Sequence, residues 1–274
     1  MTQPLLWIWL IAALLFAVAP GLDLAVAALF FDAQRGVFPT DLLPALQTLR
    51  ELIWNLFHLV ALVPLIFGIQ ALYTKAPLRI PGRFWGYCVT LVVLGPVALV
   101  NLGLKSNWGR ARPAEVAEFG GTSTFTPALQ WADQCSNNCS FVSGEASAAA
   151  VAAILAGLML WNVVPPARRR VLLVVLVTFV AVASIMRVMK GRHFLSDVVW
   201  AWIFMGTLAQ VLARAFNLGP AVQRVTWAAL RTDARSFWRD IRKTGQLWLR
   251  MLRLSWHRLT LLSRYMRKGD MRNV

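Results

Sequence analysis

Arg187-Val-Met-Lys-Gly-Arg-His-Phe-Leu-Ser-Asp197 is a charged stretch between two apolar runs, and the rest of the chain is organised around it. Charged side chains are costly inside a bilayer and tend to mark function, so this stretch predicts half of a phosphate-handling site. His193 and Asp197 share one face if the chain is helical here, and the carboxylate can then accept the imidazole N–H. The other ring nitrogen stays free to attack phosphorus, while Arg187 holds two phosphoryl oxygens in a fork. The competing interpretation is a membrane loop that simply carries basic residues.

The composition is that of a polytopic membrane protein. The 274 residues are 58% hydrophobic and include 13 Trp and 15 Phe, with a mean hydropathy of +0.58, which is too apolar for a soluble domain of this length. The net charge is +16, from 28 basic and 12 acidic residues. In a membrane protein such an excess indicates anionic lipid and basic cytoplasmic loops. No nucleic-acid motif accompanies the charge, so we predict no nucleic-acid partner.

Six apolar runs predict an all-α fold, a bundle of six transmembrane helices. The expected spans are 5–31, 52–73, 84–104, 141–160, 171–189 and 194–213. Pro20 and Gly21 should bend the first span, which lacks a convincing cleavage site and is expected to be retained. Asp23, near the far end of that span, is expected to reach either the interface or a polar cavity.

Short basic loops set the expected orientation. The loops at 74–83 and 168–170 and the basic C-terminal segment fall on one side, which the positive-inside rule makes cytoplasmic, with both termini there. The charged stretches that begin at Lys105 and Arg187 then share the outer face. We expect three parts: residues 1–51 as first helix and outer loop, 52–214 as the transmembrane core, and 215–274 as a cytoplasmic tail.

Two cysteines lie in the polar outer loop. Cys135 and Cys139 flank Ser-Asn-Asn, where a disulfide would require an oxidising compartment. Metal binding is the alternative, but no second cysteine or histidine pair is nearby. We favour the disulfide, and this supports the outer placement of the loop.

The tail combines basic charge with apolar residues at near-helical spacing. We expect a basic amphipathic tail, either one helix or two helices broken at Gly245, on the anionic cytoplasmic leaflet. Tryptophans and basic side chains suit such an interface. Packing on a partner protein or on a second copy of the chain is the alternative.

Three charged segments form one ordered pattern. Lys105 is followed after six residues by Arg112-Pro113, next comes Phe141-Val-Ser-Gly-Glu-Ala-Ser147, and Arg187, His193 and Asp197 complete it. This pattern resembles the type 2 phosphatidic acid phosphatase superfamily, whose signature is K-x6-R-P, then P-S-G-H, then S-R-x5-H-x3-D. The first and third motifs match in spacing and in nearly every charged position. The resemblance covers roughly residues 52–213 and says nothing about the tail.

The resemblance implies a phosphatase that forms a phosphohistidine. His193 would be the nucleophile, oriented by Asp197. The implied phosphate-binding residues are Lys105, Arg112, Ser143, Gly144 and Arg187. The backbone N–H of Gly144 would open a helix, where unpaired N–H groups favour an anion. Several converging cations can support phosphoryl transfer without a metal, so we expect neither a metal nor a cofactor.

The sequence departs from the family pattern at three positions. Val142 and Met186 replace a proline and a serine, and both changes look tolerable. Glu145 replaces the histidine that protonates the leaving group, and a buried glutamic acid that keeps its proton would serve as the general acid. Alternatively, Glu145 pairs with Lys105 or an arginine, and water or a substrate group assists the leaving group. Arg110 has no fixed role in the family pattern and is a candidate for guiding an anionic headgroup.

These observations predict an integral membrane phosphatase that hydrolyses a phosphomonoester of a lipid at the periplasmic face of a bacterial inner membrane. Lipid A is the favoured substrate, because segment 135–147 resembles a subgroup of such phosphatases in Gram-negative bacteria. Phosphatidylglycerol phosphate and undecaprenyl pyrophosphate remain open, and a lipid phosphotransferase would use the same residues. The alternative of another class is a non-catalytic phospholipid-binding or transport protein. The retained His193 and Asp197 argue against that alternative.

Overall fold

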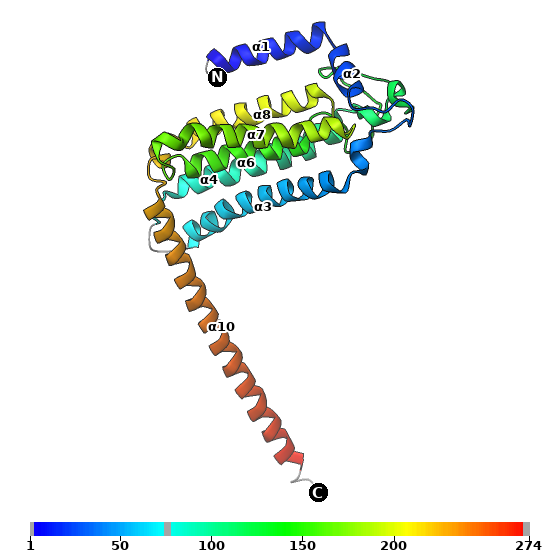
Figure 1. Cartoon of the computed structure of the whole chain (residues 1–274). Helices are drawn as coiled ribbons and strands as arrows, with labels where there is room; N and C mark the ends of the chain where they lie inside the picture. Colours follow the sequence, from blue (N-terminus) through cyan, green and yellow to red (C-terminus); the bar gives the residue numbers. More distant parts are fainter. Residues whose placement is uncertain (1–2, 74–77, 271–274) are drawn as a thin grey trace. The chain divides into compact units, whose positions relative to one another are not determined.

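The computed structural model describes residues 3–73 and 78–270 and is built of helices (Figure 1). No strand occurs in these ranges, so the predicted all-α class is confirmed. By internal contacts the chain divides into two compact units, Met1–Trp227 and Ala228–Val274.

The first unit contains the N-terminal helices α1 (Gln3–Val18) and α2 (Gly21–Ala28), which pack on α8 (Leu195–Ala215). Beyond α8, the short α9 (Leu218–Val222) packs against α4 (Gly82–Val92) and α8. The first unit ends at Trp227.

Apolar helices make this a multi-pass membrane protein. In the described part of the chain, four helical runs are long and apolar enough to cross a membrane: α3 (Pro44–Tyr73), Gly82–Asn107, Pro166–Met189 and α8. The second run comprises α4, the π-helical η2 (Val93–Leu104) and α5 (Lys105–Asn107), and the third comprises η5 (Pro166–Arg168) and α7 (Arg169–Met189). The pair α1 and α2 is a fifth candidate if the two helices form one span.

Two of the six expected spans are not single helices long enough to cross a membrane. Helices α1 and α2 meet at 82°, at the Pro20-Gly21 step that predicted a bend, because proline cannot donate the backbone hydrogen bond that a continuous helix needs. Helix α6 (Gly144–Leu160) has 17 residues and is therefore about 26 Å long, shorter than a hydrocarbon core of about 30 Å.

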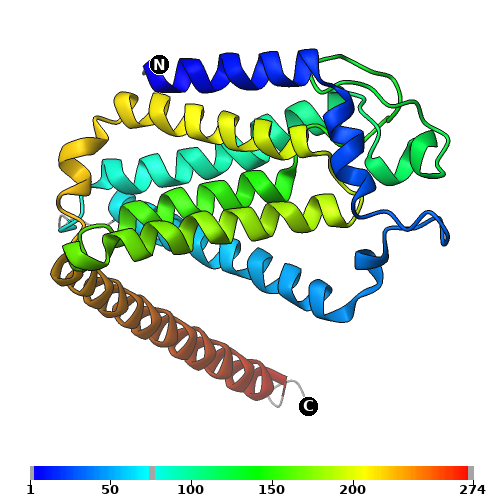
Figure 2. The ribbon, with the colours of Figure 1, turned by 45° about the horizontal axis from the view of Figure 1, so that its top comes forward.

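Helix α6 is the central helix of the bundle. It contacts α3, α4, η2, α7 and α8, and Figure 2 shows α6 and α7 side by side. Small residues make this possible, since Ala146, Ala148, Ala149 and Ala152 are all buried and let neighbouring backbones approach closely. Larger aliphatic side chains on α7, such as Val174 and Val177, remain exposed on its outer face, as expected for contact with lipid.

The charged stretches meet at one end of the bundle. The N-terminal ends of α6 and α8 and the C-terminal ends of α5 and α7 lie at this end, beneath the loop that connects α5 to α6 (Figure 2). That loop is fixed by an apolar cluster in which Phe38, Phe119 and Phe194 are buried together. The fold thereby brings together residues that are about 90 positions apart in the sequence.

The C-terminal helix α10 (Trp227–Asp270) is continuous through Gly245. A glycine in a helix interior costs only about 1 kcal/mol relative to alanine, so it need not break the helix. The tryptophans Trp238, Trp248 and Trp256 are exposed in this unit. Of the two arrangements expected for the tail, the structure has the single helix.

Gly109→Ala should destabilise the loop above the bundle. Gly109 has φ +73°, and an added Cβ would lie 1.6 Å from the carbonyl oxygen of Ala132, so the backbone would have to move. Gly120 has a similar φ of +84° with nothing within 4 Å of such a Cβ, which makes Gly120→Ala the matched control. We expect about 1–2 kcal/mol of strain in both variants and a further 1–3 kcal/mol or more in Gly109→Ala. Thermal unfolding in detergent measures the difference, and equal losses would contradict the crowding at Gly109.

Candidate active site

Arg110 is fully buried and binds two carboxylates. Its Nη1 donates to Oδ1 of Asp197 at 2.5 Å and its Nη2 to Oδ2 of Asp23 at 2.7 Å. Its Nε donates to the carbonyl oxygen of Thr126 at 2.8 Å, and the guanidinium carbon lies 4.4 Å from the centre of the Phe194 ring. Buried charges are stable only when paired and hydrogen-bonded in this way. Arg110 therefore cannot guide a headgroup, and Asp23 reaches the buried interior instead of the interface.

Two serines complete the hydrogen bonds of these carboxylates. Ser196 donates its backbone N–H to Oδ1 of Asp23 at 2.8 Å and its hydroxyl to Oδ2. Asp197 lies in the first turn of α8, where Oδ2 accepts the backbone N–H of Phe194 at 2.8 Å and the hydroxyl of Ser140. These bonds fix the start of α8 and the segment before it.

His193 is held by a backbone carbonyl. Its Nδ1 lies 2.7 Å from the carbonyl oxygen of Ser140. A carbonyl oxygen can only accept, so Nδ1 carries the proton and Nε2 keeps its lone pair. Oδ2 of Asp197 is 3.8 Å from Nδ1, too far for the direct hydrogen bond expected from the sequence. The reason is that α8 begins at Leu195, so His193 is outside the helix and the four-residue spacing does not align the two side chains. Asp197 instead acts on His193 through Ser140.

The imidazole is neutral at ordinary pH. Burial, together with the positive charges of Lys105 and Arg187, lowers the pKa of His193 to about 3, against the opposing effect of Asp197. A neutral ring with a free Nε2 is the form that can attack phosphorus.

Three buried cations lie at the same end of the bundle as this histidine. Lys105, Arg112 and Arg187 come from α5, the following loop and α7, and each is mostly shielded from solvent. Nη2 of Arg112 donates to the carbonyl oxygen of Asn138 at 2.6 Å, and burial, followed by the charge of Arg192, lowers the pKa of Arg112. Among the described residues, Nε of Arg187 is buried without a hydrogen-bond partner. Unsatisfied buried donors are costly, so this arrangement suits a bound anion.

The start of α6 faces the same cations. Ser143 caps the helix, its Oγ accepting the N–H of Ala146 at 3.3 Å, and Gly144 is the first helical residue. A Cβ on Gly144 would lie 3.8 Å from the Lys105 side chain, which shows how closely the helix end approaches that lysine. Free N–H groups at a helix start favour an anion. The five predicted phosphate-binding residues thus lie at one end of the bundle.

Glu145 forms ion pairs with two arginines. Its Oε1 accepts Nε and Nη2 of Arg50 at 2.9 and 2.8 Å, and Nη1 of Arg187 lies 3.3 Å from the same oxygen. Arg50 was not predicted as a site residue, because it lies outside the three motifs in a segment expected to be a loop. The structure extends α3 back to Pro44, and this turns Arg50 toward Glu145.

Cys135 and Cys139 are joined by a disulfide in the loop that precedes α6. Immediately after it, the N–H of Cys139 donates to the carbonyl of Lys105 at 2.9 Å, and that of Ser140 donates to the carbonyl of Arg110 at 2.8 Å. This segment therefore joins the first charged motif to the residue that orients His193.

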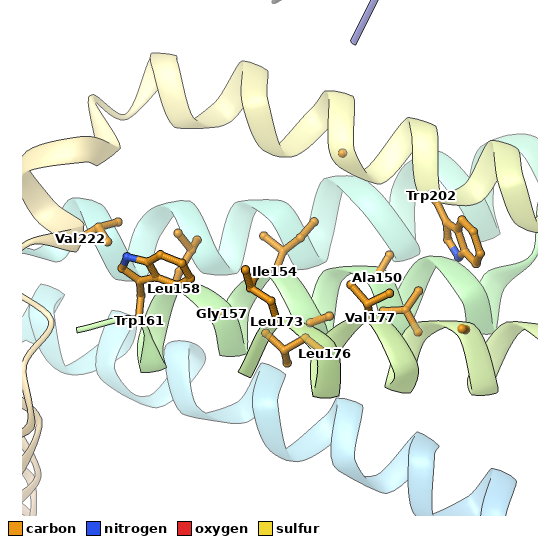
Figure 3. A pocket seen from close by; sticks show the side chains of 14 residues that line it. Ala150, Ile154, Gly157, Leu158, Trp161, Leu173, Leu176, Val177, Trp202 and Val222 are labelled. Atoms are coloured by element: carbon orange, nitrogen blue, oxygen red, sulfur yellow. The ribbon is translucent and has the colours of Figure 1, made fainter. Parts of the chain in front are cut away.

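A large apolar groove lies elsewhere on the bundle. It has a volume of about 690 Å³ and runs between α6 and α7, bounded also by Trp202 and Gly206 of α8 (Figure 3). Figure 3 shows Ile154, Leu173 and Val177 among its lining side chains. None of the charged residues at the helix ends lines it, so its surface suits hydrocarbon chains and not phosphate chemistry.

Arg110→Ala should destabilise the protein strongly. It leaves two buried carboxylates without their counter-ion, for which we expect a loss of about 3–5 kcal/mol. Arg35→Ala is the control, because the Arg35 side chain is 75% exposed and its 3.6 Å pair with Asp32 should contribute no more than about 1 kcal/mol. Chemical denaturation in detergent compares the two, and similar losses would refute the importance of the buried network.

His193 should make the protein sensitive to acid. The unfolded chain binds a proton near pH 6.5, whereas the folded chain does not until about pH 3, so stability is lost as the pH falls from 6.5 toward 3. We expect a loss of roughly 2 kcal/mol between pH 6.5 and 5 that His193→Asn abolishes and the control His58→Asn does not. Unfolding measured at several pH values tests this, and parallel curves for wild type and His193→Asn would contradict it.

Comparisons with known proteins identify the family of this chain. The family model of the PAP2 superfamily matches residues 84–219, which include all three motifs. The chain is 34% identical over 212 residues to a lipid A 4'-phosphatase of Rhizobium leguminosarum, covering 73% of this chain and 89% of that protein. The corresponding enzyme of Rhizobium etli is also 34% identical over 212 residues, 73% of this chain and 80% of that protein.

A lipid A 4'-phosphatase of Francisella tularensis subsp. novicida is 29% identical over 201 residues, which cover 71% of this chain and 86% of the relative. No solved structure gives a significant match. The extended similarity to these relatives and the family match confirm the resemblance seen in the motifs: the chain belongs to the PAP2 superfamily.

Proposed function

We propose that this protein is a membrane phosphatase that hydrolyses a phosphomonoester of lipid A. The observation that carries the proposal is a buried, neutral His193, protonated on Nδ1, at the end of the bundle that also holds three buried cations. Among the described residues, one of these cations, Arg187, has a buried Nε without a hydrogen-bond partner, which suits a phosphate dianion. The names of the relatives support lipid A as the substrate.

The proposed reaction has two steps. Nε2 of His193 attacks phosphorus, so that the Nε2–P bond forms as the P–O bond to the lipid breaks, while Lys105, Arg112 and Arg187 stabilise the three equatorial oxygens. Ser143 and the N–H of Gly144 complete the oxygen contacts. Water then breaks the Nε2–P bond, which releases inorganic phosphate and restores the imidazole. Asp197 keeps the ring oriented through Ser140.

Glu145 has two candidate roles. As general acid it would hold a proton and donate it to the leaving oxygen. Its ion pairs with Arg50 and Arg187 support the alternative, a structural role. In that case the leaving oxygen takes its proton from water. Glu145→Gln separates the two roles, since loss of the acid predicts a fall in kcat of about 100-fold or more, whereas loss of the ion pairs acts mainly on phosphate affinity.

We further propose that the chain crosses a bacterial inner membrane six times, with α6 as the short fourth span and both termini cytoplasmic. The charged end of the bundle then faces the periplasm, where an oxidising environment sustains the Cys135–Cys139 disulfide. Helix α10 lies on the anionic cytoplasmic leaflet. Its exposed tryptophans and numerous arginines support this placement.

Phosphate release from purified protein in detergent tests the function. The panel is lipid A, phosphatidylglycerol phosphate, phosphatidic acid and undecaprenyl pyrophosphate. We expect release from lipid A and a loss of about 10³-fold or more in His193→Ala, because the nucleophile is removed. The control His58→Ala, on α3 and away from the cations, should retain activity near that of the wild type.

Other outcomes identify other functions. Release only from another lipid of the panel would replace the substrate, and transfer of phosphate to a second lipid would indicate a phosphotransferase. Binding of phosphorylated lipid without any release would favour the phospholipid-binding or transport alternative and overturn the proposal.

A further inference from the structure

Glu145 creates an electrostatic problem at the proposed phosphate site. Its carboxylate contacts Arg187, one of the three cations that would bind phosphate. Two charges near a protein surface interact more strongly than the same charges in water, so an uncompensated carboxylate here would repel a phosphate dianion. The motif pattern has a histidine at this position, which carries no negative charge. A glutamate therefore requires a compensating change elsewhere.

Arg50 provides that compensation. It approaches from α3 and binds a single oxygen of Glu145 through both Nε and Nη2, at 2.9 and 2.8 Å. The contact of Glu145 with Arg187 is longer, 3.3 Å, and uses one nitrogen. Glu145 is thus bound more closely to Arg50 than to the proposed phosphate-binding arginine.

Solvent exposure decreases from Arg50 through Glu145 to Arg187. The side chains of Arg50, Glu145 and Arg187 are 40%, 19% and 11% exposed. They line a small pocket with Ile53, Ala183, Met186 and Lys190, and Glu145 is the acidic residue among these described lining residues. Arg50 thus lies at the rim and Arg187 inside. An anion that reaches Arg187 meets its buried, unsatisfied Nε and displaces only the longer contact from Nη1.

We propose that Arg50 is a positioning residue that makes Glu145 compatible with phosphate binding. It offsets the charge of the carboxylate and keeps it bound when phosphate takes over Arg187. This inference rests on the proposed function, because it assumes that the anion at Arg187 is the substrate phosphate. It extends the site to α3, a helix that carries none of the three motifs.

The proposal is tested by measuring phosphate binding in the wild-type protein and in the Glu145→Gln variant, each with and without Arg50→Gln. The probe is inorganic phosphate, and the readout is the concentration that half-maximally raises the melting temperature. Arg50→Gln should weaken binding about tenfold, equivalent to about 1.4 kcal/mol, because the Glu145 charge is left uncompensated. In the Glu145→Gln background the same Arg50→Gln change should alter binding less than about threefold. Arg35→Gln is the matched control. It removes an exposed charge that pairs with Asp32 and not with Glu145, and it should have no effect.

Lipid hydrolysis provides the second readout. Arg50→Gln should raise KM more than it lowers kcat, and Arg50→Lys should recover part of the affinity, since lysine restores the charge but not the fork. Equal weakening of phosphate binding in both backgrounds would mean that Arg50 contacts the phosphate directly, and no weakening in either would mean that it has no part in binding. Both results overturn the inference. The expected binding pattern without lipid hydrolysis would refute the proposed function and leave the role of Arg50 intact.

Discussion

The geometry of the site depends on the burial of Arg110 between two carboxylates. This guanidinium joins α2 to the start of α8 through Asp23 and Asp197, from the loop that follows α5. Removing three charges from water is costly, and the cost is offset only when each charge finds its partners at good geometry. The same requirement that stabilises the network therefore fixes where α8 begins and how Ser140 and His193 are presented.

A second group of charges has the opposite balance. The buried triad pairs one cation with two anions. The second group contains Lys105, Arg112 and Arg187, which are buried and interact electrostatically with one another, and Arg187 pairs with Glu145, which Arg50 binds as well. The protein thus has one ion cluster whose charges are paired, which orders the backbone, and one with an excess of positive charge, which suits an anionic ligand.

The sequence predicted the helical class, most of the spans and the three charged motifs, because hydrophobic runs and short-range spacing are local properties of the chain. It did not predict that Arg110 binds two buried carboxylates while Arg112, two residues on, donates to a backbone carbonyl. Adjacent arginines in a loop look alike until the tertiary packing of Phe194 and Asp23 selects one of them. Arg50 was missed for a similar reason, since its partner is 95 residues away and no periodic pattern links the two.

The hydrogen bond from His193 to the Ser140 carbonyl has a consequence for the mutational robustness of the site. A main-chain carbonyl is present whatever side chain occupies position 140, so single substitutions there leave the acceptor chemically unchanged. The tautomer of His193, the proposed nucleophile, is therefore set by the path of the backbone and not by the identity of the side chain at position 140. Replacing side chains one at a time would reveal the importance of Asp197 and Arg110, which hold that path in place. It would not reveal the carbonyl oxygen of Ser140, the atom that contacts the imidazole.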